Sequence, residues 1–328
     1  MTKTGRAGAA LASGATARHE RPRTRRGRLQ DVRIGTVPIL WNNADLPELT
    51  PFVPADVVLD EIARLGYAGT QTGTGFPAGA ALRDALHSRN LALAEVYGAI
   101  PASVDGPVRG AADVLAGALN TLDDGDGEVL VAALALSVGR VERAGRATEP
   151  GTPRLTDDGW RRLAALLKGA ARAARTRGRR LAFHPHAGTY VETPDEVERL
   201  AAETDAGLVG LCLDVGHYLV GGGDPAAAVR RFGERVTHVH LKDVAAEPLA
   251  ALREGRIVGF LDALRARIFV ELGGGVVDLD AVLDALADRE YAGWLMLEQD
   301  TTWRPPNESA AISRRVLDYA IRRFGGAP

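Results

Sequence analysis

Hydrophobic and polar positions along the chain follow two periods, one typical of strands and one typical of helices. An apolar stripe of helical period follows Pro54, formed by Val57, Val58, Ile62 and Leu65. Further helices are expected at 80–89, 111–122, 157–177 and 308–323. The segment 128–136 is almost continuously apolar, as a strand buried on both faces should be. Eight segments of strand type are expected in all, at residues 33–41, 68–73, 91–100, 128–136, 180–186, 209–214, 236–242 and 293–298.

The connections between these strands are too long for hairpins, so parallel strands joined by right-handed helical crossovers are expected. One helix start carries a recognisable signal, because Thr193 precedes Glu196 by three residues as in a capping box. Eight parallel strand–helix units close into a barrel, usually of about 250 residues. The sequence therefore predicts the α/β class and a (β/α)₈ TIM barrel, with residues 31–328 forming one catalytic domain.

Residues 1–30 depart from this pattern and are predicted to be a disordered basic tail. Residues 1–28 carry a net charge of +7, which leaves −9 for the rest of the chain because the whole sequence carries −2. Such a segment buries too little apolar surface to offset the entropy lost on ordering. A translation-start artefact and a targeting leader are the alternatives. The acidic remainder excludes nucleic acid as an expected partner, since nucleic-acid binding needs a basic surface.

The composition also bears on the expected partners and cellular compartment of the protein. No run approaches the roughly 18 apolar residues of a membrane span, so no membrane partner is expected. Cys212 is the single cysteine, which excludes an internal disulfide and agrees with a reducing compartment. A cytoplasmic location is therefore expected, and a homo-oligomer is left open.

Ligand-type side chains gather at the ends of four late strands. Five of the seven histidines fall within residues 184–240. Because side chains alternate along a strand, apolar residues at 181 and 183 facing the helices turn residue 184 inward, and the same rule applies to three further strands. Active sites of such barrels lie at the carboxyl ends of the strands. The inward side chains there are His184, Asp214, His240 and Glu298.

Two imidazoles and two carboxylates suit one borderline divalent cation. Mn²⁺ is the first choice, with Co²⁺ or Zn²⁺ as alternatives. Without a cation, burial of two carboxylates would cost considerable free energy. His238 lies one layer deeper than His240 and is interpreted as a core residue.

At these positions the chain resembles the xylose-isomerase-like barrel superfamily, and within it the inosose dehydratase family. The resemblance covers about residues 33–300. It includes LDVGH at 213–217 and three stretches that the wider superfamily shares, GDP at 223–225, HVHLKD at 238–243 and GWLMLE at 293–298. The stretches WNNADLPEL at 41–49 and HPHAGT at 184–189 are more particular to inosose dehydratases. The resemblance implies that the four ligands named above hold a metal.

The resemblance also implies an activity: a metal-dependent hydro-lyase that acts on a cyclic polyol or ketosugar through an enediolate. A sugar isomerase or epimerase and a catalytically silent binding barrel are the alternatives. Gln71 departs from the family, which typically has glutamate there, so a carboxylate is missing. The proton-transfer candidates are His217, Lys242, His186 and Glu95, and the candidate substrate contacts are Trp41 and Gln71.

Some of these residues have a second interpretation. His186 and His217 could be ligands or could support other residues. Lys242 could be a surface lysine, and Glu95 could form a salt bridge. A lysine can act as a base near neutral pH only if burial lowers its pKa.

Overall fold

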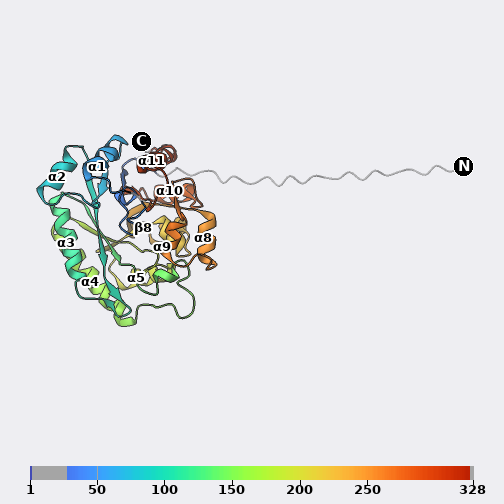
Figure 1. The fold of residues 1–328 in the computed structure, drawn as a ribbon. Coiled ribbons are helices and arrows are strands. Elements are labelled where there is room, and N and C mark those ends of the chain that lie inside the picture. Colours follow the sequence, from blue (N-terminus) through green and yellow to red (C-terminus); the bar gives the residue numbers. More distant parts are fainter. Residues whose placement is uncertain (2–27, 50, 326–328) are drawn as a thin grey trace.

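The computed structural model describes residues 1, 28–49 and 51–325, so most of the predicted tail lies outside the described residues. Eight parallel strands form a closed barrel in the order β1-β12-β9-β8-β7-β6-β3-β2. Figure 1 shows the helices arranged around the strands, with α1, α2, α3 and α4 along one side. The predicted TIM barrel is therefore confirmed. The strands are β1 (Arg33–Thr36), β2 (Gly69–Gln71), β3 (Ala92–Ile100), β6 (Val129–Leu134), β7 (Arg180–Phe183), β8 (Val209–Asp214), β9 (Val236–Leu241) and β12 (Trp294–Leu297).

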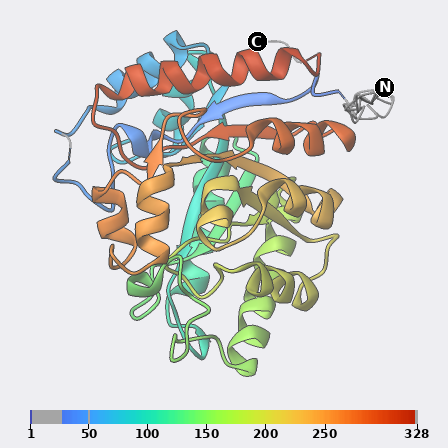
Figure 2. The same cartoon turned by 90° about the vertical axis from the view of Figure 1, so that its right-hand side faces the viewer.

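Helices surround the strands. α11 lies beside β1 (Figure 2), where the first strand of the barrel, β1, pairs with the last, β12. The capping box is present, since the Thr193 hydroxyl accepts from the Glu196 N–H at 3.3 Å. Within the described part of the chain, no helix is both long and apolar enough to cross a membrane. The helices are α1 (Ala55–Arg64), α2 (Ala80–His87), α3 (Ala111–Asp124), α4 (Asp157–Thr176), α5 (Pro194–Glu203), α6 (Val215–Val220), α7 (Pro225–Phe232), α8 (Ala246–Arg253), α9 (Phe260–Arg265), α10 (Leu279–Asp288) and α11 (Pro306–Arg322).

Short elements extend the loops between these units. Two antiparallel ribbons pair β4 with β5 and β10 with β11. They comprise β4 (Ala102–Ser103), β5 (Gly106–Pro107), β10 (Asp243–Val244) and β11 (Phe269–Val270), and the 3₁₀ turns are η1 (Pro38–Leu40), η2 (Val141–Arg143) and η3 (Gly233–Arg235).

Two strands end earlier than the hydrophobic pattern predicts, and a proline stands near each end. β1 stops at Thr36 and the chain turns into η1, whose first residue, Pro38, has no N–H for a strand partner. β7 stops at Phe183, just before His184-Pro185, and the His186 N–H donates to the Val191 carbonyl at 3.0 Å. His184 and His186 therefore sit in a loop that folds back over the mouth of the barrel.

Inside the barrel, the large side chains of Met296 and Trp294 lie next to glycines of β1 and β2. A Cβ on Gly35 would lie 2.5 Å from the Sδ of Met296, and a Cβ on Gly69 would lie 2.6 Å from the Trp294 ring. Met296 and Trp294 are both fully buried. This packing fills the barrel between its strands, and the pocket among the described residues lies at the carboxyl ends of the strands, where sites of such barrels are found.

Candidate metal centre

The structure brings the four predicted ligands together at the carboxyl ends of four neighbouring strands. Their donor atoms all lie within 4.8 Å of one another. All four side chains are buried or nearly so. His184 follows β7, Asp214 ends β8, His240 lies on β9 and Glu298 follows β12.

Asp214 is the central member of this cluster. It caps α6, because its Oδ1 accepts from the His217 N–H at 2.7 Å. Its Oδ2 lies 3.8 Å from His184 Nε2 and 3.9 Å from His240 Nδ1. That oxygen is buried and has no hydrogen-bond partner among the described residues. A buried carboxylate oxygen without a partner is costly, and a divalent cation between these donors would satisfy it. The residues present therefore fit a metal.

The protonation states of His184 and Glu298 suit metal ligands. Burial lowers the pKa of His184 well below its ordinary value, so its imidazole is neutral. Burial would raise the pKa of Glu298, but Lys242 and His240 outweigh that effect and hold it well below its ordinary value. Neutral imidazoles and ionised carboxylates are the forms that coordinate metals. The other two ligands shift the opposite way: burial raises the pKa of Asp214 to about 6, and acidic neighbours outweigh burial at His240 and raise its pKa well above its ordinary value.

Lys242 lies next to the cluster and is fully buried, so its interpretation as a surface lysine is wrong. Its Nζ lies 2.8 Å from Asp300 Oδ1, 3.2 Å from Glu298 Oε1 and 3.4 Å from Asp214 Oδ2, and it contacts His217 Nε2 at 2.9 Å. Burial opposes the charged form, but the carboxylates outweigh it and raise the pKa above its ordinary value. These contacts favour the ammonium form of Lys242, and its role in proton transfer stays a prediction.

His186 and His217 stack on each other, with ring centroids 3.7 Å apart. His186 lines the pocket, whereas His217 lies beneath it and is buried. Burial lowers the pKa of His186 to about 4. Its Nδ1 lies 2.8 Å from the Ala187 carbonyl and donates to it, because a carbonyl can only accept. The neutral ring therefore keeps an unprotonated Nε2.

Glu95 on β3 lies across the barrel from β9, one layer below the metal cluster. Its Oε2 is 2.9 Å from His240 Nε2 and also accepts from His238. Burial alone would raise the pKa of Glu95, but the two imidazoles outweigh it and lower the pKa to about 2. Glu95 does not line the described pocket, and its contacts match the salt-bridge interpretation. Such a carboxylate fixes the ring of a metal-binding histidine so that the other nitrogen faces the metal.

The two predicted substrate contacts lie in different places. Gln71 lines the pocket at the end of β2. Trp41 is buried, and its Nε1 donates to Glu61 Oε2 at 2.5 Å, so it packs under η1 and is absent from the described pocket lining.

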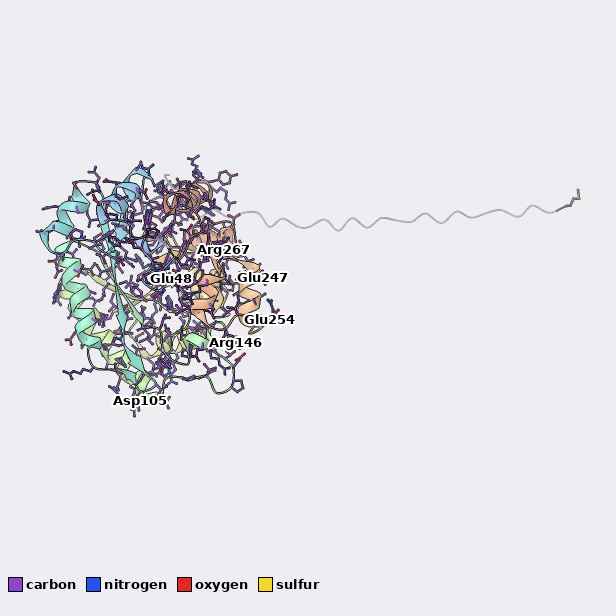
Figure 3. The ribbon with its side chains drawn as sticks, in the orientation of Figure 1. Glu48, Asp105, Arg146, Glu247, Glu254 and Arg267 are labelled. Atoms are coloured by element: carbon purple, nitrogen blue, oxygen red, sulfur yellow. The ribbon has the colours of Figure 1, made fainter. Side chains whose placement is uncertain are left out.

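The pocket has a volume of about 520 Å³. Its lining combines imidazoles and carboxylates with apolar side chains, among them Ile39, Leu134 and Leu136. Many other charged residues lie on the outside of the barrel, such as Asp105 and Glu254 (Figure 3). A pocket of this size and composition is typical of small-molecule sites.

Sequence reasoning missed two acidic residues of the pocket, Asp45 and Asp300. Asp300 is buried and pairs with Lys242. Its signal was available, because Asp300 follows Glu298 by two residues and so continues the inward alternation of β12. Asp45 lies within the stretch at 41–49 that carries the family resemblance, but no strand pattern points it inward.

Comparison with known proteins defines the class. A family model described as xylose isomerase-like TIM barrel matches residues 59–320, so the chain belongs to this family. The chain is 36% identical over 303 residues to the rhizopine catabolism protein MocC of Rhizobium meliloti, covering 92% of this chain and 90% of the relative. It is 34% identical over 297 residues to an inosose dehydratase of Geobacillus kaustophilus, covering 89% and 96%. The predicted family is confirmed.

A solved structure of similar fold is titled IOLI protein with a binding zinc atom. It has a TM-score of 0.65 and 15% sequence identity, and the match covers 89% of this chain and 99% of that one. At this identity the likeness shows the shared barrel.

Proposed function

We propose that this protein is a metal-dependent hydro-lyase of the inosose dehydratase type, which removes water from a cyclic ketopolyol. The observation that carries the proposal is the buried Asp214 Oδ2, which has no hydrogen-bond partner among the described residues and lies among the donor atoms of three further ligands. Identity of 34% to an inosose dehydratase along most of both chains supports the same reaction. Mn²⁺ is the proposed metal, with Co²⁺ or Zn²⁺ as alternatives, because the donors are mixed nitrogen and oxygen.

A divalent cation held by His184, Asp214, His240 and Glu298 would polarise the substrate carbonyl and so acidify the neighbouring C–H. His186 is the proposed base, because its neutral ring lines the pocket with a free Nε2. It takes the proton on the carbon next to the carbonyl and returns it to the departing hydroxyl. One C–H and one C–O bond break, a C=C bond forms, and water leaves.

Lys242 supplies fixed positive charge beside this reaction. Its ammonium group lies within 3.4 Å of three carboxylates and is fully buried. A preorganised charge in a dry site stabilises negative charge that develops on the substrate. Because Lys242 stays protonated, we assign it an electrostatic role rather than that of a base.

Isomerisation or epimerisation of a ketosugar is the second candidate. Gln71 favours it, since an amide at the pocket can bind a hydroxyl but cannot give up a proton to expel one. Both reactions begin with the same proton abstraction, and they differ in whether hydroxide then leaves.

Metal analysis followed by an activity screen tests the proposal. The purified protein is assayed with 2-keto-myo-inositol and with ketohexoses, with and without added Mn²⁺. Metal-dependent growth of ultraviolet absorbance is expected with the inosose, because only dehydration makes a conjugated enone. A product of unchanged composition with no such absorbance would favour isomerisation. No turnover of any ketopolyol would favour the binding barrel.

Two further expectations accompany the proposal. The substrate is a small polyol or ketosugar, consistent with a pocket of about 520 Å³. A cytoplasmic location stays a prediction that depends on the lone cysteine, Cys212, which is buried.

A further inference from the structure

Asp300 has one paired oxygen and one free oxygen. Its Oδ1 accepts from Lys242 Nζ at 2.8 Å. Its Oδ2 is buried and has no hydrogen-bond partner in the described chain. The side chain lines the pocket and is only 2% exposed as a residue. A buried acceptor left without a donor is unfavourable unless a ligand supplies one.

The segment around Asp300 is held from both sides. The Asn43 side chain donates to the Asp300 carbonyl, and Gln299 Nε2 donates to the Thr301 carbonyl at 2.8 Å. With Lys242 holding Oδ1, the direction of Oδ2 is fixed before any ligand enters. A preorganised acceptor loses little entropy on binding, which favours a specific contact.

The contacts of Asp300 separate it from the neighbouring metal ligands. Its Oδ1 is engaged by Lys242, and it belongs to none of the groups of described residues whose donor atoms converge on one point. Asp300 also differs from a carboxylate with a purely structural role, whose two oxygens are both bound within the protein. Glu196 illustrates that case, because both of its oxygens bind Arg140.

We propose that Asp300 determines specificity by accepting a hydrogen bond, through Oδ2, from a hydroxyl of the cyclic ketopolyol. This inference rests on the proposed function and names a contact in the same pocket. The hydroxyl belongs to the part of the ring that lies near the metal ligands, since Lys242 contacts both Asp300 and Glu298. A ligand with hydrogen or an ether at this position loses the donor.

Asp300→Asn is the first test, because it keeps the shape but replaces one acceptor oxygen by an NH₂ donor. With Lys242 retaining the amide oxygen, the NH₂ group faces the substrate hydroxyl. We expect kcat/KM for 2-keto-myo-inositol to fall about 10- to 100-fold, mainly through KM, as expected for one hydrogen bond to a charged group. Metal content should stay near that of the wild type, whereas Tm should fall, because asparagine removes one of the three carboxylates that face the buried Lys242.

Monodeoxy analogues of 2-keto-myo-inositol identify the contact. The wild-type protein should bind one analogue about 10- to 100-fold more weakly than it binds 2-keto-myo-inositol. The Asp300→Asn variant should bind the same analogue and 2-keto-myo-inositol with equal affinity. Calorimetry with each analogue provides these affinities independently of turnover. If every analogue weakens both proteins equally, Asp300 makes no such contact and the inference is wrong.

Asp243→Asn is the matched control, since Asp243 is a buried carboxylate at the end of the neighbouring strand. Its oxygens accept from four backbone N–H groups, those of Val244, Gly273, Gly275 and Val277, and it is not part of the described pocket lining. It should lower Tm and leave the ranking of the analogues unchanged. Turnover of inosose with wild-type KM in Asp300→Asn would overturn the inference alone. Absence of both binding and turnover in the wild type would overturn the proposed function as well.

Discussion

Two buried groups of charged side chains in this barrel solve the same electrostatic problem in different ways. Arg140 and Glu196 form a two-pronged pair at 2.7 and 2.8 Å, and Glu196 Oε2 also accepts two backbone N–H groups at 3.0 Å. In the metal cluster, Asp214 Oδ2 has no hydrogen-bond partner within the part of the chain described, although Lys242 lies 3.4 Å away. Both carboxylate oxygens of Glu196 have hydrogen-bond donors within the protein, whereas Asp214 Oδ2 has none and is available to something that binds.

The Arg140–Glu196 pair is expected to contribute to stability, and the metal cluster to function. Arg140 connects the loop that holds Pro153 to the start of α5, because it bonds both the Pro153 carbonyl and Glu196. The metal cluster ties no loops together in this way and opens into the pocket. We therefore expect mutations in the first group to change the free energy of unfolding and mutations in the second to change metal binding and turnover.

The largest expected effect follows loss of a metal ligand. Asp214→Ala or His240→Ala should reduce bound metal from about one ion per chain to near zero after dialysis, because each removes one of four donors. Turnover of the ketopolyol should fall at least about a thousandfold, since carbonyl polarisation by a metal contributes several kcal/mol. Elemental analysis and steady-state kinetics measure the two. Wild-type metal content in both variants would show that the site is wrong.

Glu196→Gln should affect stability instead. Breaking a buried ion pair leaves Arg140 without its charge partner and costs about 3–5 kcal/mol at neutral pH. Metal content should be unchanged in the folded protein. Denaturation in urea measures the cost. Asp158→Asn, which breaks the exposed pair with Arg161, is the control and should leave the urea midpoint nearly unchanged.

The cost of Glu196→Gln should also depend on pH. Burial alone would raise the pKa of Glu196, but Arg140 outweighs it and holds the pKa below its ordinary value of 4.5. A carboxyl group with a lowered folded pKa stabilises the protein fully above the unfolded pKa, and this contribution is lost as pH falls through the folded pKa. The difference between wild type and variant should therefore shrink below about pH 4.5. A constant difference down to pH 3 would contradict this.

Much of the fold was predictable because buried parallel strands are nearly continuous apolar segments. β8 was predicted with its observed bounds, and β6 lies inside the predicted segment. The ends of β1 and β7 were not, since the apolar pattern continues through Pro38 and up to His186 while the backbone turns away. Where a strand stops depends on which backbone groups find partners, and hydrophobicity does not report that.

The metal cluster was predictable by strand alternation, and its surroundings were less so. His184, Asp214, His240 and Glu298 each lie within one residue of the carboxyl end of a strand, so one rule places all four. Asp300 was missed because the alternation was followed only to the end of the strand. The contact of Glu95 with His240 depends on which strand faces β9 across the barrel, and this is a property of the closed sheet that β3 alone does not encode.

Glu95→Gln tests that cross-barrel contact and should have an intermediate effect. Glutamine has nearly the shape of glutamate but lacks the charge that the two imidazoles of His238 and His240 face. Loss of such a supporting carboxylate typically weakens metal affinity about 10- to 100-fold. Competition with a chelator measures the affinity without any activity assay. If excess metal restores full metal occupancy of the variant, a positioning role for Glu95 is supported. If the variant binds metal with the affinity of the wild type, that role is excluded.

Deletion of residues 1–27 should have the smallest effect and marks where the folded barrel begins. The structure places Leu29, which the sequence analysis assigned to the tail, in the core with 0% exposure, and its N–H donates to the Phe324 carbonyl at 3.2 Å. The deletion removes neither contact and no residue of the described pocket. Metal content should therefore persist, and kcat/KM should stay within about threefold, roughly 0.65 kcal/mol. Extending the deletion through residue 29 removes a buried leucine, which typically costs about 2–5 kcal/mol, and should lower Tm. A hundredfold loss of activity on removing residues 1–27 alone, with Tm unchanged, would instead mean that the basic segment acts at the pocket or in an oligomer.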